Sequence, residues 1–272
     1  MTPADAPAAA VRGLPPRMTM PSLPAFLAYL VVILFLVLSF QGAGWSFEKL
    51  ARGLPSVGDF LSRSWPPSIA RIERIAPALL ETFQMALVGT VVGVLISVPL
   101  GVLAARGLSG NRILYTTSRA LIALFRTVPD LIWALVFVIC VGLGPFAGTL
   151  AIVVDTIGFC GRFFAEAMED VDKGPQEALT AIGASRTDTI CCTVIPAAMP
   201  AFITTSLFAL EKSTRSSVIM GLVGAGGIGL ELKVAMDLFE YREAMTIILL
   251  IFVLVLAVER VGNLLRRNVL EI

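Results

Sequence analysis

Histidine is absent from the 272 residues of the chain, and cysteine occurs only four times. The first absence excludes Ser-His-Asp and Cys-His catalytic arrangements and metal sites built on imidazole. No C-x-x-C spacing occurs, so we expect the cysteines to be small apolar packing residues without a structural disulfide. They are Cys140, Cys160, Cys191 and Cys192. The G-x-x-x-x-G-K-[ST] phosphate loop is also missing, which predicts that the chain does not bind ATP itself.

Charge is scarce as well. Charged residues make up 15% of the chain, whereas they make up about 25% of an average soluble domain. Hydrophobic residues make up 57% of the chain, against about 45–50% in such a domain. The length suits six or so apolar spans of about 20 residues with short connections. Because the formal net charge is +1, no attraction to nucleic acid is expected. These features predict an all-α, polytopic membrane protein in contact with lipid.

Apolar runs divide the chain into four parts. Residues 1–22, rich in Ala, Pro and Arg, are predicted to be a disordered cytoplasmic tail. Residues 23–41 are predicted to be a first transmembrane helix that is retained, because no small-residue cleavage site follows. Residues 42–78 are predicted to be an external loop whose tryptophans bring parts of it onto the membrane surface. Residues 79–272 form the predicted core.

The core contains five further predicted spans, one of which is interrupted by Arg126, Pro129 and Asp130. The spans cover about 79–105, 113–143, 146–168, 200–223 and 244–265. Small residues in the first of these predict the close approach of a neighbouring helix; they are Gly89, Gly93, Ser97 and Gly101. The segments 169–186 and 224–243 are predicted to be polar loops.

Basic residues predict the orientation. With the N-terminus inside, the short outer loops carry only Lys233 and Arg242, and the inner segments carry most of the rest. The 42–78 segment adds five basic residues on the outside, contrary to the positive-inside rule. The basic residues of long loops influence orientation less than those of short loops. Both termini are therefore predicted to be cytoplasmic.

The coupling loop, about 169–197, contains a spaced motif. It reads Glu177-Ala178-Leu179, then Gly183, then Ile195-Pro196. We predict a short helix from Gln176 to Ile182 that ends at Gly183, because glycine adopts the left-handed conformation that stops a helix. Ala178, Leu179 and Ile182 form an apolar stripe outside the bilayer, and such a stripe favours a partner groove. The alternative is an ordinary amphipathic helix that packs on its own membrane domain.

This spacing resembles the E-A-A…G…L-P loop of ABC-importer permeases. Leu179 replaces the second alanine of that motif and Ile195 its leucine. Two further stretches, 125–135 and 211–229, resemble the phosphonate-importer permeases, and the whole resemblance covers roughly residues 65–272.

The resemblance implies a type I ABC importer permease fold in the bacterial inner membrane. It implies a non-catalytic subunit that moves phosphonate, phosphite, hypophosphite or a related phosphorus oxyanion by alternating access. The implied partners are two ATP-binding subunits, an external substrate-binding protein and a second copy of the chain. ATP and Mg²⁺ are expected on the ATPase subunits, and no cofactor is expected in this chain. The implied coupling residues are Glu177, Ala178, Leu179, Ile182, Gly183 and Pro196.

Six ionisable residues fall at apparent membrane depth, and their formal charges cancel: Arg126, Asp130, Asp155, Glu211, Lys212 and Arg215. Each is costly there, about 2.5–3.5 kcal/mol at a helix centre for Arg, Lys or Asp. They can pair with each other, as the i, i+4 spacing of Glu211 and Arg215 allows, or they can line a pathway. The pathway candidates are Arg126, Asp130, Glu211, Lys212 and Arg215, with Ser216 and Ser217 as neutral donors. We hypothesise that Arg126 and Arg215 meet the anion.

Other functions fit the sequence less well. The segment 224–229 matches G-x-G-x-x-G literally, but no preceding strand exists, so a flexible glycine-rich exit from a span is favoured over a nucleotide site. An intramembrane enzyme would need clustered acids or histidines at the membrane face. A secondary transporter would show internal repeats, and none is evident. A permease for another small solute remains the alternative within the same class.

Overall fold

The computed structural model describes residues 22–270, and every regular element in that range is a helix. The chain divides into two compact units, 1–59 and 60–272. The predicted tail, 1–22, lies outside the described residues except for its last residue.

The first unit contains helix α1, Leu23–Gly42, and most of helix α2, Phe47–Ser64. Helix α1 is apolar all round and buries no residue in this chain, as a lipid-facing helix would. Helix α2 corrects the prediction of a loop over 42–78. Its apolar positions recur at helical spacing, Phe47, Leu50, Leu54, Val57 and Leu61, and all are exposed. Gly53, Pro55 and Gly58 interrupt this pattern and are typical of loops, although the helix continues through them.

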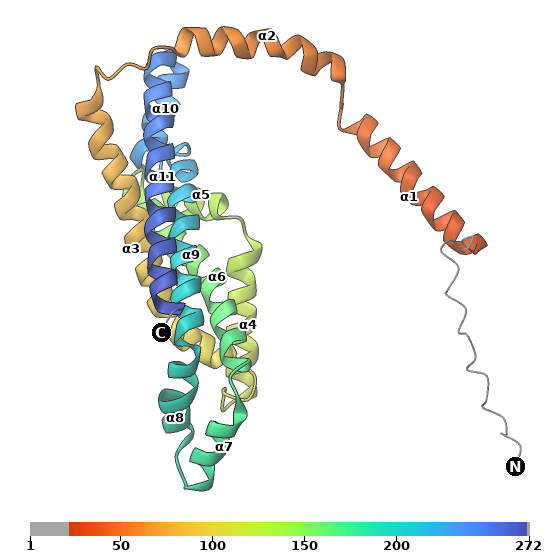
Figure 1. Cartoon of the computed structure of the whole chain (residues 1–272), viewed down its shortest axis with the longest axis vertical. Helices are drawn as coiled ribbons and strands as arrows, with labels where there is room; N and C mark the ends of the chain where they lie inside the picture. The colour runs from red at the N-terminus through yellow and green to blue at the C-terminus, as the bar shows by residue number, and fades with distance from the viewer. Residues whose placement is uncertain (1–21, 271–272) are drawn as a thin grey trace, which may run out of the picture. The chain divides into compact units, whose positions relative to one another are not determined.

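The second unit holds the core bundle (Figure 1). Its long helices are α3, Ile72–Ala104; α6, Pro145–Glu169; α9, Ile195–Gly221; and α11, Tyr241–Leu270. Helix α4, Arg112–Thr127, is followed by α5, Asp130–Val141. Within the described residues five helices are long and apolar enough to cross a membrane, and the bent pair α4–α5 makes a sixth. This agrees with the predicted six spans.

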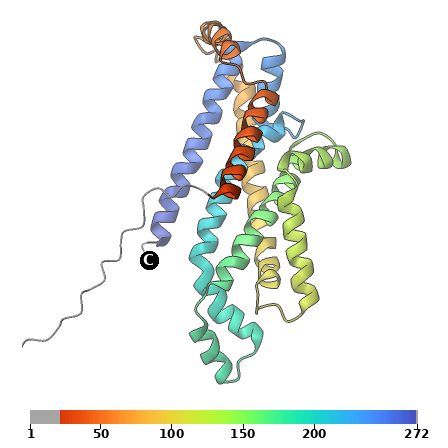
Figure 2. The same cartoon turned by 90° about the vertical axis from the view of Figure 1, so that its right-hand side faces the viewer.

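The break between α4 and α5 lies where the sequence predicts it. The two helices differ in direction by 93°, a bend that is visible in Figure 2. Pro129 has no N–H to continue the helix, and the residue before a proline is pushed towards an extended conformation. Val128 accordingly has φ −82° and ψ 123°. Asp130 then begins α5.

Helices α3 and α6 pack through the predicted small residues. A Cβ placed on Gly89 would lie 2.6 Å from Cγ2 of Ile152, and one on Gly93 would lie 2.6 Å from Cβ of Thr156. Ser97 is fully buried between them. The absent side chains therefore let the two helices approach closely, as expected for membrane helices.

The segment 224–243 is not only a loop, because it contains helix α10, Gly227–Asp237. The glycine-rich segment before it is packed rather than flexible. The Gly227 N–H donates to Oε1 of Glu81 at 2.8 Å, and the Ile228 N–H donates to Oγ1 of Thr82 at 2.7 Å. A Cβ on Gly229 would lie 2.0 Å from the Val218 carbonyl oxygen. These glycines therefore seat α10 against α3 and α9, and this contact explains the literal G-x-G-x-x-G match.

Candidate coupling segment and translocation path

Helix α7, Lys173–Ala181, is the predicted short helix between the spans. It begins three residues earlier than predicted, where the Asp172 carboxylate accepts from the Gly174 N–H at 3.1 Å. Ile182 follows its last residue, and Gly183 has φ +88°. Asp172 is therefore the N-cap of this helix, and Gly183 ends it through the left-handed conformation.

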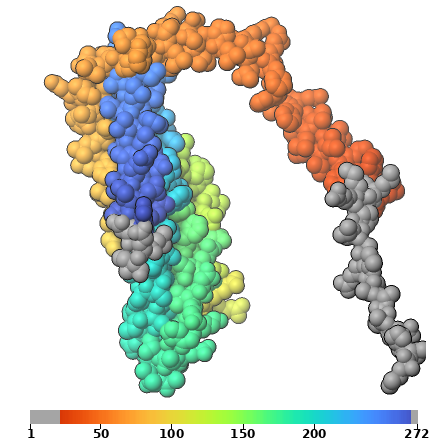
Figure 3. Space-filling view, in the orientation of Figure 1, coloured from red at the N-terminus to blue at the C-terminus, as the bar shows by residue number. Residues whose placement is uncertain are grey.

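The apolar stripe of α7 is largely uncovered within the described chain. The helix buries no residue, and Ile182 is 80% exposed. Glu177 and Ala178 are exposed as well, and Leu179 is half-buried. In Figure 3, α7 and α8 form the surface at one end of the second unit.

A continuous helical path joins the coupling loop to α9. Helix α8, Arg186–Thr189, starts with a capping box in which Ser185 and Asp188 satisfy each other's backbone N–H groups. A π-helical turn, Ile190–Val194, leads into α9. Pro196 is the second residue of α9 and has no N–H to donate to the carbonyl four residues earlier. The π-helical turn therefore lies where one α-helical hydrogen bond cannot form. Helix α8 is thereby continuous with α9.

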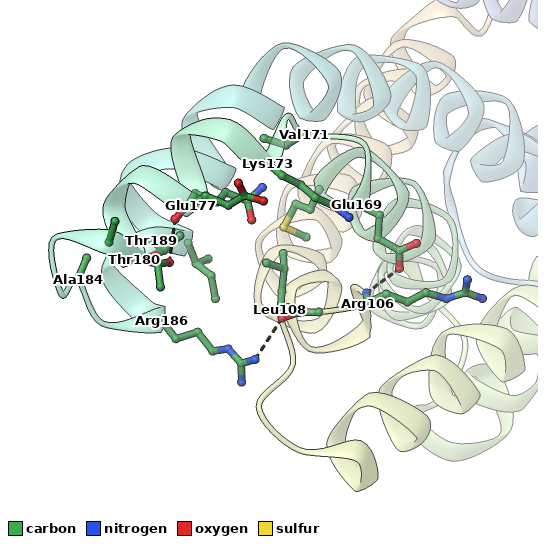
Figure 4. Close-up of a pocket in the computed structure, with 15 residues that line it drawn as sticks. Arg106, Leu108, Glu169, Val171, Lys173, Glu177, Thr180, Ala184, Arg186 and Thr189 are labelled. Carbon is green, nitrogen blue, oxygen red and sulfur yellow. Dashed lines mark hydrogen bonds between the residues drawn. The ribbon is translucent and has the colours of Figure 1, made fainter.

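A pocket of about 730 Å³ lies between the coupling loop and the ends of α3 and α6 (Figure 4). Arg186 donates to the Gly107 carbonyl at 3.2 Å across it. The Glu169 carboxylate accepts from the Arg106 N–H at 2.7 Å and from Arg119 at 3.1 Å. A hydrogen bond to the Tyr115 hydroxyl raises the pKa of Arg106. The Arg186 bond therefore ties α8 to the segment after α3, and the Glu169 contacts join the ends of α3 and α6 to α4.

Most of the charges at membrane depth are paired. Lys212 on α9 contacts Asp155 on α6 at 2.8 Å. Arg215 and Glu211 pair at 3.0 Å along α9, as the i, i+4 spacing predicts. Arg266 on α11 contacts the other Glu211 oxygen at 3.3 Å, a partner that the sequence reasoning missed because it is 55 residues away.

The two serines of the candidate path have different roles. The Ser216 hydroxyl donates to Oδ2 of Asp130 at 2.6 Å, which ties the start of α5 to α9. The Ser217 hydroxyl donates to the Ser213 carbonyl within its own helix at 2.6 Å. Asp130 and Ser216 are thus brought together, while the Ser217 donor is already used.

Arg126 differs from the other five. Within residues 22–270 its side chain has no ion pair or hydrogen bond, and it is exposed in the single chain. A Cβ on Gly158 would lie 2.8 Å from the Arg126 backbone nitrogen, so this arginine lies beside the middle of α6. Arg119 and Arg162 lie near it. The sequence holds a signal for part of this cluster, because Arg112, Arg119 and Arg126 recur every seven residues and share one face of α4.

These observations define a multi-pass, all-α membrane protein with a short exposed helix between two spans. Residues 97–270 match the family described as "Binding-protein-dependent transport system inner membrane component", and the chain belongs to this family. It is the non-catalytic permease subunit of an ABC importer, lies in the inner membrane and works with separate ATPase subunits.

Two relatives come from Stutzerimonas stutzeri. The putative phosphite transport system permease protein HtxC is 38% identical over 246 residues, which cover 90% of this chain and 87% of the relative. The phosphite transport system permease protein PtxC is 34% identical, covering 80% of each. Among solved structures, an inward-facing MetNI methionine ABC transporter chain has a TM-score of 0.65 at 24% identity, covering 74% of this chain and 99% of that chain. This last similarity supports the type I importer permease fold alone.

Proposed function

We propose that this permease carries phosphite, phosphonate or a related phosphorus oxyanion such as hypophosphite into the cell by alternating access. The observation that supports this substrate class best is the similarity to two permeases of phosphite transport over most of both chains. The excess of arginine beside the middle of α6 is compatible with an anionic cargo, because an anion crossing a low-dielectric region needs positive groups or water.

The transport cycle requires partners outside this chain. An external binding protein delivers the anion to the outer face, and a second copy of the chain completes the path. Two ATP-binding subunits hold ATP and Mg²⁺, and their closure moves the coupling loops. Arg126, Asp130, Glu211, Lys212 and Arg215, with Ser216 and Ser217, are the proposed path residues.

Helix α7 is proposed to be the docking helix for the ATPase. Its exposed stripe and the capped, continuous α8–α9 path support this role. Docking places α7 in the cytoplasm, and with six spans both termini are then cytoplasmic. At the opposite end of the second unit, Arg71 before α3 pairs with Glu240 before α11 at 2.7 Å and with Glu243 in the first turn of α11 at 3.0 Å. The segments proposed to be external therefore meet at one end.

Reconstitution tests the substrate class. The permease, its ATPase and its binding protein are placed in liposomes, and ATP-dependent uptake of phosphite, methylphosphonate, hypophosphite, sulfate and methionine is compared. We expect one of the phosphorus oxyanions to be taken up at least about tenfold faster than sulfate or methionine. Preferential methionine or sulfate uptake would contradict the proposal and assign the chain to another solute of the same importer class.

A further inference from the structure

Three arginines surround a small pocket beside α6. Arg119, Arg126 and Arg162 line it together with Glu166 and the apolar residues Ala104, Ile122, Ala123 and Ala165. Its volume is about 270 Å³, which is large compared with the roughly 30 Å³ that one water takes up in the liquid. A tetrahedral oxyanion with several waters fits this space.

The arginines of the pocket are unequally satisfied. Arg119 donates from Nε to the Ala104 carbonyl at 3.1 Å and from a terminal nitrogen to the Glu169 carboxylate at 3.1 Å. Arg162 pairs through Nε with Glu166 at 2.8 Å. Its terminal nitrogens, and the whole Arg126 guanidinium, have no partner within the described chain. Glu169 and Glu166 thus pair with two of the three arginines, and Arg126 carries a positive charge that no described residue pairs with.

This excess charge cannot face lipid. The Arg162 side chain is 53% exposed and that of Arg119 35%, and Arg126 is beside the middle of a membrane-spanning helix. Charged side chains at such a depth face a water-filled cavity or a partner. Arg126 differs in this respect from Arg215, which pairs with Glu211.

We propose that the pocket between α4 and α6 is a binding subsite for the transported oxyanion, held by Arg119, Arg126 and Arg162 on the coupling-loop side of the span. This inference rests on the proposed function for the identity of the anion. Arginine suits the role because its guanidinium presents planar, paired donors to oxyanions. Glu166 and Glu169 orient two of the arginines and limit the affinity, so the anion can leave again.

The test uses a cysteine at Ala123, which lines the pocket, in a chain whose four native cysteines are replaced by serine. The complex with its ATPase is labelled with two thiol reagents of similar size, one anionic and one neutral. We expect the anionic reagent to react several-fold faster, because a positive cleft concentrates anions, and we expect inorganic phosphite to slow the reaction. Arg126→Gln should remove most of this preference.

Transport provides the second measurement. Arg126→Gln and Arg162→Gln should each lower phosphite uptake about tenfold or more, the expected loss of a hydrogen bond to a charged group, while ATP hydrolysis stimulated by the binding protein persists. Arg112→Gln is the matched control, since it lies on the same face of α4 but outside the pocket, and it should leave uptake and labelling unchanged.

Two results would overturn the subsite. The first is equal labelling by both reagents, which would also be expected if a carboxylate of the second copy neutralised the arginines. The second is labelling unaffected by phosphite in a complex that transports it. Failure of the proposed function is distinguishable, because the unsubstituted complex would then take up no phosphorus oxyanion while the labelling preference could still be read.

Discussion

Glu211 pairs with two arginines from different helices, so the charges at membrane depth form a group of three instead of a simple pair. Arg215 is the contact on its own helix at 3.0 Å, and Arg266 reaches it from α11 at 3.3 Å. The i, i+4 spacing predicted the first contact, but nothing local in the sequence indicates the second. A charge exchange between Glu211 and Arg215 alone would place the new arginine against Arg266.

A full charge reversal tests whether Arg215 meets the anion. We expect Glu211→Arg with Arg215→Glu to destabilise the protein, since like charges then face each other across α9 and α11. Adding Arg266→Glu should restore a folded complex with normal ATPase activity but without phosphorus oxyanion uptake. Thermal unfolding in detergent, ATP hydrolysis and uptake are the measurements. Full uptake by the triple variant would show that the group only fixes helix packing.

The elements that were predicted correctly are those with strong local patterns. The apolar spans, the break at Pro129 and the helix ended by Gly183 all follow from composition and from the conformational limits of proline and glycine. Helices α2 and α10 were missed because Gly53, Pro55 and Gly58 in one, and the glycine run before the other, are typical of loops. Helix α10 forms because Glu81 and Thr82 of α3 accept its first N–H groups.

At the scale of the coupling loop, Gly183→Pro should uncouple ATP hydrolysis from uptake while the protein stays in the membrane. Gly183 has φ +88°, which proline cannot adopt because its ring holds φ near −65°. The turn between α7 and α8 would therefore change direction. The measurements are ATPase activity and uptake of the reconstituted complex.

Normal uptake by Gly183→Pro would contradict the coupling role. The location of α7 is checked separately with a cysteine at Glu177 in a chain without the native cysteines. We expect a membrane-impermeant reagent to label it only from the cytoplasmic side. Labelling from outside alone would reject the proposed orientation.

The contact between α3 and α6 gives a stability prediction. Gly89→Ala should destabilise the folded protein by about 1–3 kcal/mol, the usual cost of overpacking, because the new Cβ would lie 2.6 Å from Ile152. Gly53→Ala in α2 is the matched control. No atom of the described part of the chain lies within 4 Å of its Cβ position, so the helix should lose no stability. Thermal unfolding in detergent compares them, and equal midpoints would refute the close packing.

At the scale of the whole molecule, we expect two copies of the chain in each transporter, together with two ATPase subunits. Six spans make half of the twelve-helix path usual in this importer class. A single chain also leaves Arg215 50% exposed, and the Arg126 side chain has no partner among residues 22–270. Charged groups at membrane depth need a partner or water. Native mass measurement of the complex in detergent checks the stoichiometry, and a complex with one copy of this chain would be inconsistent with it.

The sequence by itself determined the class of the protein. Apolar runs of membrane length, the spaced Glu177…Gly183…Pro196 motif and the absence of histidine and of a phosphate loop depend only on the order of residues, so each could be read directly. Only the tertiary structure decided which charges neutralise each other and which do not. Arg126 and Arg215 are equivalent in the sequence, yet Glu211 pairs with one, while the other shares a pocket with Arg119 and Arg162. That difference arises from the crossing of α4 over Gly158, because contacts between distant segments leave no local pattern in the chain.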